Sequence, residues 1–375
     1  MKTNGVRTLL LLGVAALLIP AGALAQQEAD EDESAQQTDD VIIVTGTSAA
    51  RSEFNTPQSV NQFDEVEIRK FTSNSQADIL TQLPGVSAEG GGGEVATNFF
   101  VRGLPSGGQF QFTPLEYDGI PAFTTFGLNS SAFDVYYRND LGIDRLEYVT
   151  GGVSNLFGPG SVAGIINYIS KTGGPENEGT AQIEWSNRGR FRGDIYSSGP
   201  LGGPDTNTFY AVSGYYREDE GPLDSGLDTE GFQLRGNLKR EFADGSGSFT
   251  LYGQAIDDRV QFFLPLPLDG DSRERVRGND GKVVFTANTA EAGQLRFATP
   301  DGVFESPIED GVETQGGSIA AVLDKDLGDG WGLNVKAKYA RYDHSFNLFL
   351  DGDGVVNLPE TLGDFLDNRG LGDIS

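Results

Sequence analysis

The sequence contains no cysteine, one histidine and one methionine among its 375 residues. Without cysteine no disulfide can form, so stability must come from burial and hydrogen bonding. A single histidine, His344, excludes a zinc site built on a histidine cluster. Positive charge is scarce as well, because 27 basic residues accompany 55 acidic ones and the formal net charge is −28. We therefore expect no nucleic-acid partner, since a polyanion would be repelled.

Long apolar runs are absent after residue 25, so the sequence predicts no transmembrane helix there. Glycine and aromatic residues are abundant instead, with 52 Gly, 24 Phe and 12 Tyr. Glycine serves tight turns, and aromatic residues favour half-buried strands. The composition therefore predicts many strands joined by turns. Such a chain can still cross a membrane as a β-barrel, whose strands alternate between apolar and polar residues.

Motifs of enzymes and of resident metals are missing. Ser161 lies among glycines, but Pro159 occupies the first glycine position of a nucleophile elbow. No Lys-Ser or Lys-Thr follows Gly90–Gly93, as a phosphate-binding loop would require. Asp351–Gly354 lacks the spacing of an EF-hand calcium loop. We predict that the protein is not an enzyme and carries no resident cofactor or metal.

The N-terminus has the pattern of a cleaved secretory signal. Lys2 and Arg7 precede a long uncharged run that ends in small residues typical of a cleavage site. A transmembrane helix is the alternative, but the run is short for a span and contains Pro20. We interpret residues 1–25 as a signal peptide. Residues 26–39 are rich in acidic side chains and predict a disordered tail outside the cytoplasm.

A short run of β-branched residues follows this tail, in the segment DVIIVTGT at residues 40–47. The segment predicts a strand, although no sheet is evident beside it in the sequence. Two interpretations remain open. It is either the first strand of the domain that follows or a strand that adds to the exposed sheet edge of a partner protein.

Residues 51–172 mix helix-like and strand-like segments and predict a compact α+β domain. A short helix is expected between a serine cap and the stop at Pro84-Gly85. Its cap is Ser73 or Ser75, and its apolar face is Ile79, Leu80 and Leu83. Four segments bounded by glycine or proline predict short strands: NFFVRGL, PLEYDGIP, DRLEYVTGG and GIINYISKTG.

From residue 177 the sequence alternates between apolar and polar side chains. In GFQLRGNLKREF the two kinds fall on opposite faces, and TAQIEWSN, SFTLYGQA and WGLNVKAKYARY follow the same pattern. A half-buried sheet of a soluble protein would alternate similarly. Export, aromatic residues near strand ends and charge on the opposite face favour a lipid-facing barrel with a wet interior. Residues 265–315 lack this pattern and are predicted to form an extended outer loop.

Taken in order, these segments resemble the TonB-dependent receptors of the Gram-negative outer membrane. The resemblance rests on DVIIVTGT, TPQSVNQFDEVEI, ADILTQLPGV, FFVRGL, LEYDGIP and residues 143–173, whose shared order extends over about 130 residues. Within the family pattern, TPQSVNQFDEVEI resembles the first strand and turn of the plug domain. The sequence departs from the pattern at Thr150-Gly151-Gly152, where the family often has Arg-Gly-Pro.

The resemblance implies roles for individual residues. DVIIVTGT resembles the TonB box, which implies TonB-binding residues Asp40, Val41, Ile42, Ile43, Val44, Thr45 and Gly46. Contacts between plug and barrel are implied for Arg102, Gly103, Arg145 and Glu147. The outer apices of the plug carry the candidate ligand-facing aromatics Phe110, Phe112, Phe123 and Phe126. Packing of these phenylalanines within the plug core is the alternative.

The implied fold class is an α+β plug domain, residues 51–172, inside a transmembrane antiparallel β-barrel of about 22 strands. Residues 177–375 would supply roughly eight to ten of those strands. A barrel of about eight strands is filled by its own side chains and has no room for a plug. We therefore expect the sequence to be the N-terminal part of a larger receptor.

The implied function is import of a scarce, large nutrient with energy delivered through the TonB box. A ferric siderophore is the leading expectation, with the ferric chelate as transported ligand and no resident cofactor. An oligosaccharide or cobalamin importer is the alternative within the family, and a passive porin is the alternative from another class. The implied partners are TonB with its inner-membrane complex, outer-membrane lipid and an extracellular small molecule. The implied location is the Gram-negative outer membrane, with the N-terminal tail in the periplasm.

Overall fold

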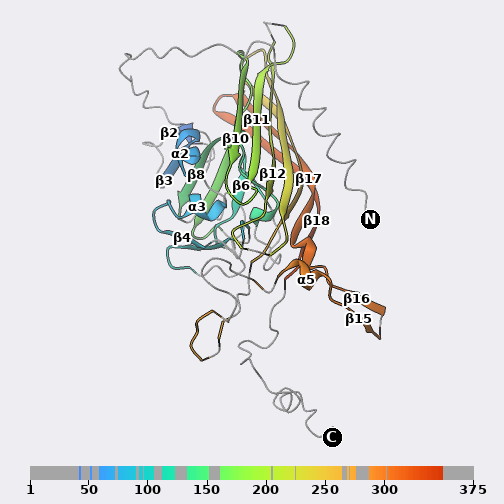
Figure 1. Cartoon of the computed structure of the whole chain (residues 1–375). Helices are drawn as coiled ribbons and strands as arrows, with labels where there is room; N and C mark the ends of the chain where they lie inside the picture. The colour runs from blue at the N-terminus through green and yellow to red at the C-terminus, as the bar shows by residue number, and fades with distance from the viewer. Residues whose placement is uncertain are drawn as a thin grey trace, which may run out of the picture.

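The structure is a computed structural model, and it has two parts packed face to face (Figure 1). It describes residues 42–43, 51–52, 59–71, 75–89, 93–95, 97–104, 112–122, 133–151, 161–203, 206–223, 225–263, 268–269, 271–275, 286, 288–300 and 302–348. A mixed α+β domain occupies the described residues from 59 to 171, and a large antiparallel sheet follows it. The predicted signal peptide and acidic tail lie outside the described residues.

The mixed domain is built on a five-stranded sheet in the order β3-β8-β9-β6-β7. These strands are β3 (Val60–Asp64), β8 (Ile143–Thr150), β9 (Gly164–Ser170), β6 (Leu115–Tyr117) and β7 (Ile120–Pro121). Strands β6 and β9 run parallel, and the other neighbours are antiparallel. Around the sheet lie α2 (Glu65–Lys70), α3 (Gln76–Leu80), η2 (Phe133–Val135) and the pair β4 (Val86–Glu89) and β5 (Asn98–Val101). A separate pair joins β1 (Ile42–Ile43) to β2 (Arg51–Ser52).

The predicted helix is confirmed, and three of the four predicted strands are confirmed as β5, β8 and β9. The fourth prediction is wrong, because PLEYDGIP turns at Asp118-Gly119 and forms the hairpin of β6 and β7. Ser75 is the N-cap of α3, where its backbone N–H donates to the Asp78 carboxylate at 3.1 Å. Ile79, Leu80 and Leu83 are buried in the core of the domain. Their burial explains the helix, because a helix this short is held by tertiary packing and not by its own propensity.

The segment resembling a first strand and turn contains a second helix, so that part of the expectation is wrong. Helix α2 follows β3 directly and begins with a capping box. The backbone N–H of Glu67 donates to the Asp64 carboxylate at 2.7 Å, and the N–H of Asp64 donates to the Glu67 carboxylate at 3.1 Å. Local capping therefore decides the helix here, since only Ile68 within it is buried.

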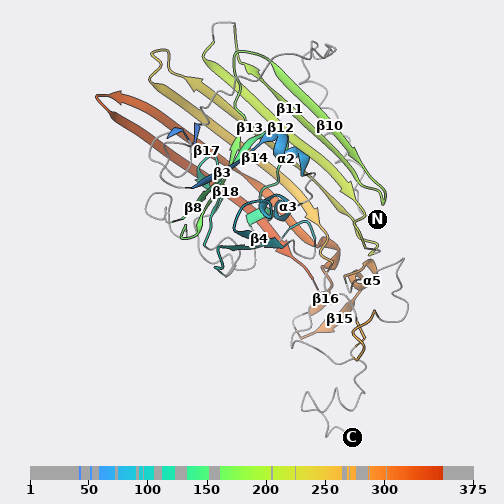
Figure 2. The same ribbon diagram turned by 90° about the vertical axis from the view of Figure 1, so that its left-hand side faces the viewer.

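The second part is a seven-stranded antiparallel sheet in the order β10-β11-β12-β13-β14-β17-β18. Its strands are β10 (Glu178–Trp185), β11 (Phe191–Pro200), β12 (Thr208–Asp219), β13 (Thr229–Glu241), β14 (Gly247–Val260), β17 (Val312–Gly328) and β18 (Trp331–Phe346). Figure 2 shows these long strands crossing behind the mixed domain. No helix within the described ranges is long and apolar enough to cross a membrane.

The large sheet exposes its apolar face and buries its polar face, which is the reverse of a sheet in a soluble protein. On β13 the apolar Leu234 and Leu238 are 48% and 43% exposed, whereas the polar Gln233 and Asn237 are 1% and 8% exposed. The predicted alternation is therefore confirmed, with the polar face turned toward the mixed domain. The same outer surface carries further exposed apolar side chains: Ile183, Trp185, Phe249, Leu251, Ile319, Trp331, Val335 and Tyr339. An apolar surface of this extent marks an interaction with lipid or protein.

Residues 265–315 were predicted to form an extended loop, and their described part contains short helices and strands. They contain α5 (Ala290–Gly293), the hairpin of β15 (Arg296–Thr299) and β16 (Gly302–Glu305), and η3 (Ile308–Asp310). Strand β17 already begins at Val312, so the boundary predicted at residue 315 is wrong. Phe297 and Phe304 pair across the hairpin with ring centroids 4.9 Å apart, which explains why this segment forms a pair of strands.

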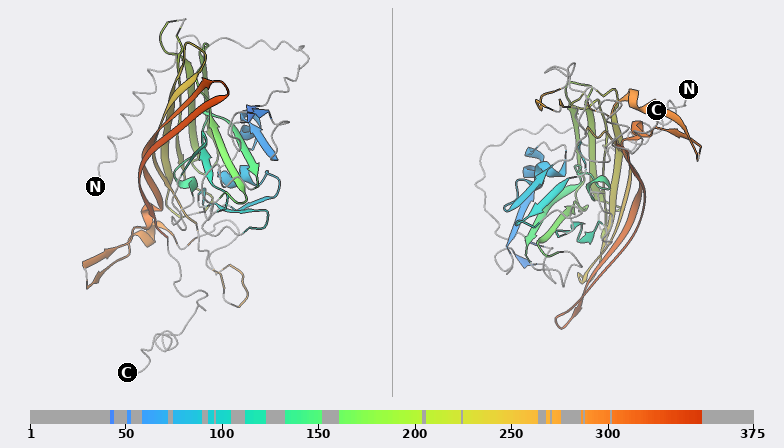
Figure 3. Two further views of the ribbon diagram at one scale, coloured as in Figure 1. Left: turned by 180° about the vertical axis from the view of Figure 1, so that it is seen from behind. Right: turned by 90° about the horizontal axis from the view of Figure 1, so that it is seen from below.

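The sheet has two distinct ends. Residues 201–207, 242–246 and 329–330 join strands at one end, which we call the short-turn end. Residues 186–190, 220–228 and 261–311 join strands at the other end, which we call the long-loop end. The β15–β16 hairpin lies beyond the long-loop end (Figure 1). Seen from below, the sheet curves around the mixed domain (Figure 3).

Candidate functional site: a polar seam between domain and sheet

The candidate site is the contact between the mixed domain and the polar face of the large sheet. We call this contact the seam. On the domain side it consists of residues 93–95, the β6–β7 hairpin with residues 115–122, and residues 133–142. On the sheet side it consists of the inward side chains of β11 to β18. Three groups of hydrogen bonds and ion pairs hold its main acidic and basic side chains, and further bonds such as that from the Gln254 amide to the Tyr136 carbonyl lie between them.

The first group is centred on Asp258 of β14. The Arg138 guanidinium donates to this carboxylate at 2.8 Å, and the Arg217 guanidinium donates to it at 2.9 Å. Asp258 is 2% exposed, so two charged donors share one buried carboxylate. The side-chain amide of Gln233 binds the backbone of Arg138 on both sides. Its Oε1 accepts from the Arg138 N–H at 3.0 Å, and its Nε2 donates to the Arg138 carbonyl at 2.8 Å. This group fixes residues 138–140 to the sheet.

Asp140 extends the first group toward β12. Its carboxylate accepts from the Ser213 hydroxyl at 3.0 Å, from the Gln233 amide at 3.1 Å and from the Gly142 backbone N–H at 2.8 Å. An ion pair with Arg235 at 3.5 Å completes its surroundings. A Cβ on Gly142 would collide with the Ser213 side chain. Glycine is therefore required here by the close approach of the two surfaces.

The second group lies at the long-loop end. Glu94 forms ion pairs with Arg190, at 3.0 Å, and with Arg217. Arg190 belongs to the connection between β10 and β11, and Arg217 to β12, so one carboxylate ties the mixed domain to two places on the sheet. Gly93 permits this contact, because a Cβ there would lie 2.5 Å from the Gln261 carbonyl oxygen.

The third group holds the β6–β7 hairpin. Asp118 and Gly119 form its turn with φ values of 56° and 69°, as in the two-residue turns that favour Asp-Gly. The Lys336 ammonium donates to the Gly119 carbonyl at 2.9 Å. The Lys338 ammonium donates to the carbonyls of Pro121 and Ala122 at 3.2 and 2.9 Å. Both lysines belong to the polar face of β18.

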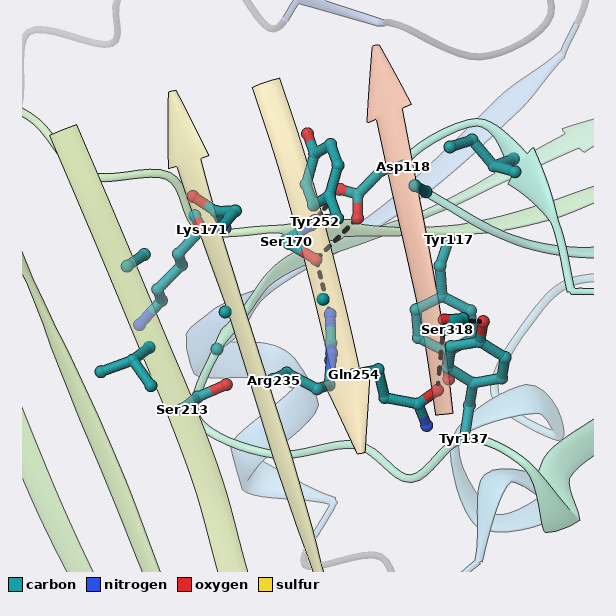
Figure 4. Close-up of a pocket in the computed structure, with 18 of the residues that line it drawn as sticks. Tyr117, Asp118, Tyr137, Ser170, Lys171, Ser213, Arg235, Tyr252, Gln254 and Ser318 are labelled. Carbon is teal, nitrogen blue, oxygen red and sulfur yellow. Dashed lines mark hydrogen bonds between the residues drawn. The ribbon is translucent and has the colours of Figure 1, made fainter. Parts of the chain in front are cut away.

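A cavity of about 50 Å³ lies between the hairpin and the sheet (Figure 4). A chain of hydrogen bonds crosses it, in which Arg235 donates to the Ser170 hydroxyl at 2.5 Å and that hydroxyl donates to the Asp118 carboxylate at 2.8 Å. Tyr117 and Tyr137, stacked at 4.4 Å, contribute to the lining. A polar space of this size accommodates water.

Two acidic side chains lie in the hairpin, of which Glu116 is buried and Asp118 is half-buried. Glu116 is 1% exposed, and within the described residues one of its carboxylate oxygens has no hydrogen-bond partner. Burial raises the pKa of Glu116 from 4.5 to about 7, although the Lys336 ammonium opposes the rise. Burial also raises the pKa of Asp118, against hydrogen bonds from the backbone and hydroxyl of Ser170.

Glu116 should make the stability of the mixed domain depend on pH. The pKa of Glu116 in the folded domain is about 7 and exceeds its ordinary value of 4.5. Its contribution to the free energy of unfolding is therefore fully present below pH 4.5 and is lost as the pH rises through 7. The expected loss is about 3 kcal/mol. Glu116→Gln should flatten the dependence, as measured by urea unfolding in detergent at pH 5 and pH 8. The exposed Glu241→Gln serves as control, and an unchanged slope in the Glu116 variant would contradict the assignment.

The predicted plug–barrel residues lie outside these three groups. Arg102 is exposed in a turn, where its backbone N–H donates to the Gly85 carbonyl at 2.9 Å, and Gly103 follows it with φ of 79°. Arg145 pairs with Asp144 at 2.6 Å and with the buried Glu147 at 2.9 Å, both on its own strand. The sequence motifs did not single out Arg138, Asp140 or Glu94.

The remaining predicted residues are only partly described. Phe112 is half-buried and packs against the core of the mixed domain, which favours the alternative given for it. Phe110, Phe123 and Phe126 lie outside the described residues. Of the predicted TonB-binding residues, Ile42 and Ile43 form β1, which pairs with β2 and not with the five-stranded sheet. The others, Asp40, Val41, Val44, Thr45 and Gly46, also lie outside the described residues.

Comparison with protein families identifies the mixed domain. Residues 52–165 match the model described as TonB-dependent Receptor Plug Domain. The matched range contains α2, α3, the β6–β7 hairpin and β8, together with Glu94, Arg138 and Asp140 of the seam. The large sheet begins after it.

Curated relatives extend the similarity into the sheet. A vitamin B12 transporter of Vibrio vulnificus is 25% identical over 267 residues, which cover 68% of this chain and 40% of that protein. A hemin receptor of Yersinia pestis is 29% identical over 160 residues, which cover 42% of this chain and 22% of that protein. The ferripyoverdine receptor of Pseudomonas aeruginosa is 28% identical over 160 residues, which cover 42% of this chain and 18% of that protein. The chain thus spans less than half the length of these relatives.

Solved structures share the fold. The crystal structure of the ferripyoverdine receptor of the outer membrane of Pseudomonas aeruginosa has a TM-score of 0.55 at 20% identity, over 79% of this chain and 35% of that one. The ferric yersiniabactin uptake receptor of Yersinia pestis has a TM-score of 0.54 at 16% identity, over 78% of this chain and 42% of that one. At these identities the likeness shows the fold: a plug domain packed against antiparallel barrel strands.

Proposed function

We propose that the chain is a TonB-dependent outer-membrane receptor, because residues 52–165 match the plug-domain model, and that it imports a scarce, large nutrient with energy delivered through residues 40–46. One observation carries the proposal. A plug domain is fastened by buried polar groups to the inner face of a sheet whose outer face is apolar. A domain seated in this way closes a pore, and closing a pore is useful for transport only if the domain can be moved.

The apolar outer face is proposed to contact outer-membrane lipid. Barrels of this membrane have short periplasmic turns and longer extracellular loops. The short-turn end therefore faces the periplasm, and the long-loop end, with Glu94 and the β15–β16 hairpin, faces outward. In this orientation the N-terminal tail lies in the periplasm.

Energy is proposed to arrive by strand addition. An extended segment can join the exposed sheet edge of another protein through main-chain hydrogen bonds. Ile42–Ile43 already has strand geometry and pairs with Arg51–Ser52. The energy-coupling protein TonB, with its inner-membrane complex, would replace this short internal pairing with a longer intermolecular one. Pulling on the segment then acts on β3, an edge strand of the plug sheet.

A ferric chelate is the proposed substrate class. The hemin and ferripyoverdine receptors among the relatives are named for iron-containing ligands. Cobalamin is the second candidate, because the similarity to a vitamin B12 transporter covers 68% of this chain. Ferric chelates and cobalamin are both large, partly flat ligands whose uptake needs more than passive diffusion. A passive porin is disfavoured by the plug domain, which would obstruct it.

Uptake assays decide between these substrates. Cells that produce the protein should accumulate radiolabelled iron from one of a panel of ferric hydroxamates, ferric catecholates or hemin, and a protonophore should stop the accumulation. We also expect the protein to be several-fold more abundant in outer membranes from iron-poor medium. Constant abundance together with uptake of labelled cobalamin would transfer the assignment to the second candidate. Accumulation that persists with the protonophore would contradict energised import.

A further inference from the structure

The β6–β7 hairpin is the peripheral element of the plug sheet. Strand β7 lies at one edge of the order β3-β8-β9-β6-β7, and β6 connects the hairpin to the rest through β9. Movement of residues 115–122 would break the pairing of β6 with β9 but leave β3, β8 and β9 joined to one another. Gly119 lies where the hairpin meets β18, and the Lys336 ammonium approaches it so closely that it would have to shift to make room for a Cβ.

The attachment of the hairpin differs from the other attachments of the plug. Lys336 is exposed and Lys338 half-buried, and each ammonium donates to neutral backbone carbonyls. By contrast, Arg138 and Asp258 form a buried pair of opposite charges. Both kinds of contact have a charged donor, but an exposed charge such as that of Lys336 is screened by solvent, whereas the buried pair of Arg138 and Asp258 is screened much less. The contact of Lys336 is therefore exchanged for water more easily than the contacts that hold residues 138–140.

Space lies directly behind the hairpin. On the sheet side, the cavity shown in Figure 4 is lined by Ser213 of β12 and Ser318 of β17, and between these strands by Arg235, Tyr252 and Gln254 of β13 and β14. Ile120 of the hairpin clusters with Ala320 of β17 and closes the cavity on that side. Withdrawal of the hairpin would enlarge this cavity along the polar face of the sheet.

We propose that Lys336 and Lys338 are positioning residues that hold the β6–β7 hairpin closed across the seam, and that its release from β18 opens the route taken by the transported ligand. The proposal rests on the proposed import function. It differs from departure of the whole plug, because Arg138 and Asp140 stay bound to β13 and β14 while the hairpin moves.

Ion conductance tests the closure without requiring a known ligand. The intact receptor, reconstituted in planar lipid bilayers with KCl on both sides, should remain closed. Lys336→Met/Lys338→Met keeps the aliphatic stems and removes the donors, and we expect openings at least tenfold more frequent. Lys239→Met/Lys325→Met is the matched control, because these lysines bond to Glu241 and Ser246 at the short-turn end. Equal opening frequencies in the two variants would overturn the proposal.

A disulfide provides the second test, because the sequence contains no native cysteine. Ile120→Cys/Ala320→Cys staples the hairpin, and the reduced form of the same protein is the control. After bond formation is verified by mass, the staple should block energised uptake and, in the Lys336→Met/Lys338→Met background, the KCl openings, and a reductant should restore both. Uptake and openings equal in the stapled and reduced forms would overturn the proposal. If the wild type shows no energised uptake, the import function fails separately while the conductance comparison still decides the hairpin.

Discussion

Deletion of Val41–Thr45 is expected to reduce energised uptake to the background of cells lacking the protein. Ligand binding at the cell surface should change by less than about twofold, which corresponds to about 0.4 kcal/mol. The reason is that the deleted segment supplies the strand that TonB is proposed to grip, while the ligand is proposed to bind at the opposite end of the plug. Uptake and surface binding of the same radiolabelled ligand are measured in parallel.

Three variants distinguish the role of the β-branched strand from that of the acidic tail. Deletion of Glu33–Gln37 shortens the acidic tail by the same length and should leave uptake nearly intact. Ile43→Pro removes one backbone donor and is incompatible with a central paired strand, so it should abolish uptake. Ile43→Val, which keeps the backbone donor and the β-branch, should retain it. Normal uptake after deletion of Val41–Thr45 would contradict the coupling role.

Replacement of Asp258 is expected to have the largest effect on plug attachment. Asp258→Asn keeps the shape of the side chain but removes the charge shared by Arg138 and Arg217. Both guanidinium groups are buried, at 8% and 3% exposure, and would remain charged. Breaking one partner of a buried pair typically costs about 3–5 kcal/mol. We therefore expect the plug to detach from the sheet at a clearly lower urea concentration.

A fluorophore on the exposed Ser87→Cys reports this detachment in detergent. Glu241→Gln is the control, because Glu241 forms an ion pair with Lys239 at 2.9 Å that is largely exposed. Exposed pairs contribute at most about 1 kcal/mol. A detachment midpoint for Asp258→Asn equal to that of Glu241→Gln would show that this buried group does not hold the plug.

The local elements were predictable where sequence neighbours decide them. Ser75 and Pro84-Gly85 delimit α3 by capping and by a helix stop, and strict alternation on β13 separated its two faces. Helix α2 was missed because its segment was matched to a family pattern, although the capping pair Asp64 and Glu67 three residues apart was a sufficient signal. The β15–β16 hairpin was missed because charge and turn residues surround its short strands.

The seam was less predictable, because its partners are far apart in the sequence. Gln233 and Arg235 were correctly assigned to the polar face, but nothing in β13 identifies Arg138 or Asp140 as their partners. Arg145 was a reasonable candidate for a barrel contact, yet Glu147 two residues away lies on the same face of β8 and pairs with it. Within the described residues Arg145 pairs on its own strand, and its role at the interface stays a prediction.

The assignment of the two sheet faces is the central claim, since transport, orientation and the seam all depend on it. Single cysteines at Leu234 and Leu238 on the outer face, and at Asn237 and Lys239 on the inner face, are spin-labelled in the receptor reconstituted in liposomes. The account predicts that labels at 234 and 238 are accessible to oxygen, which concentrates in lipid, and protected from a water-soluble nickel complex. Labels at 237 and 239 should show low oxygen accessibility. Outer-face labels that the nickel complex reaches as readily as oxygen would contradict the account.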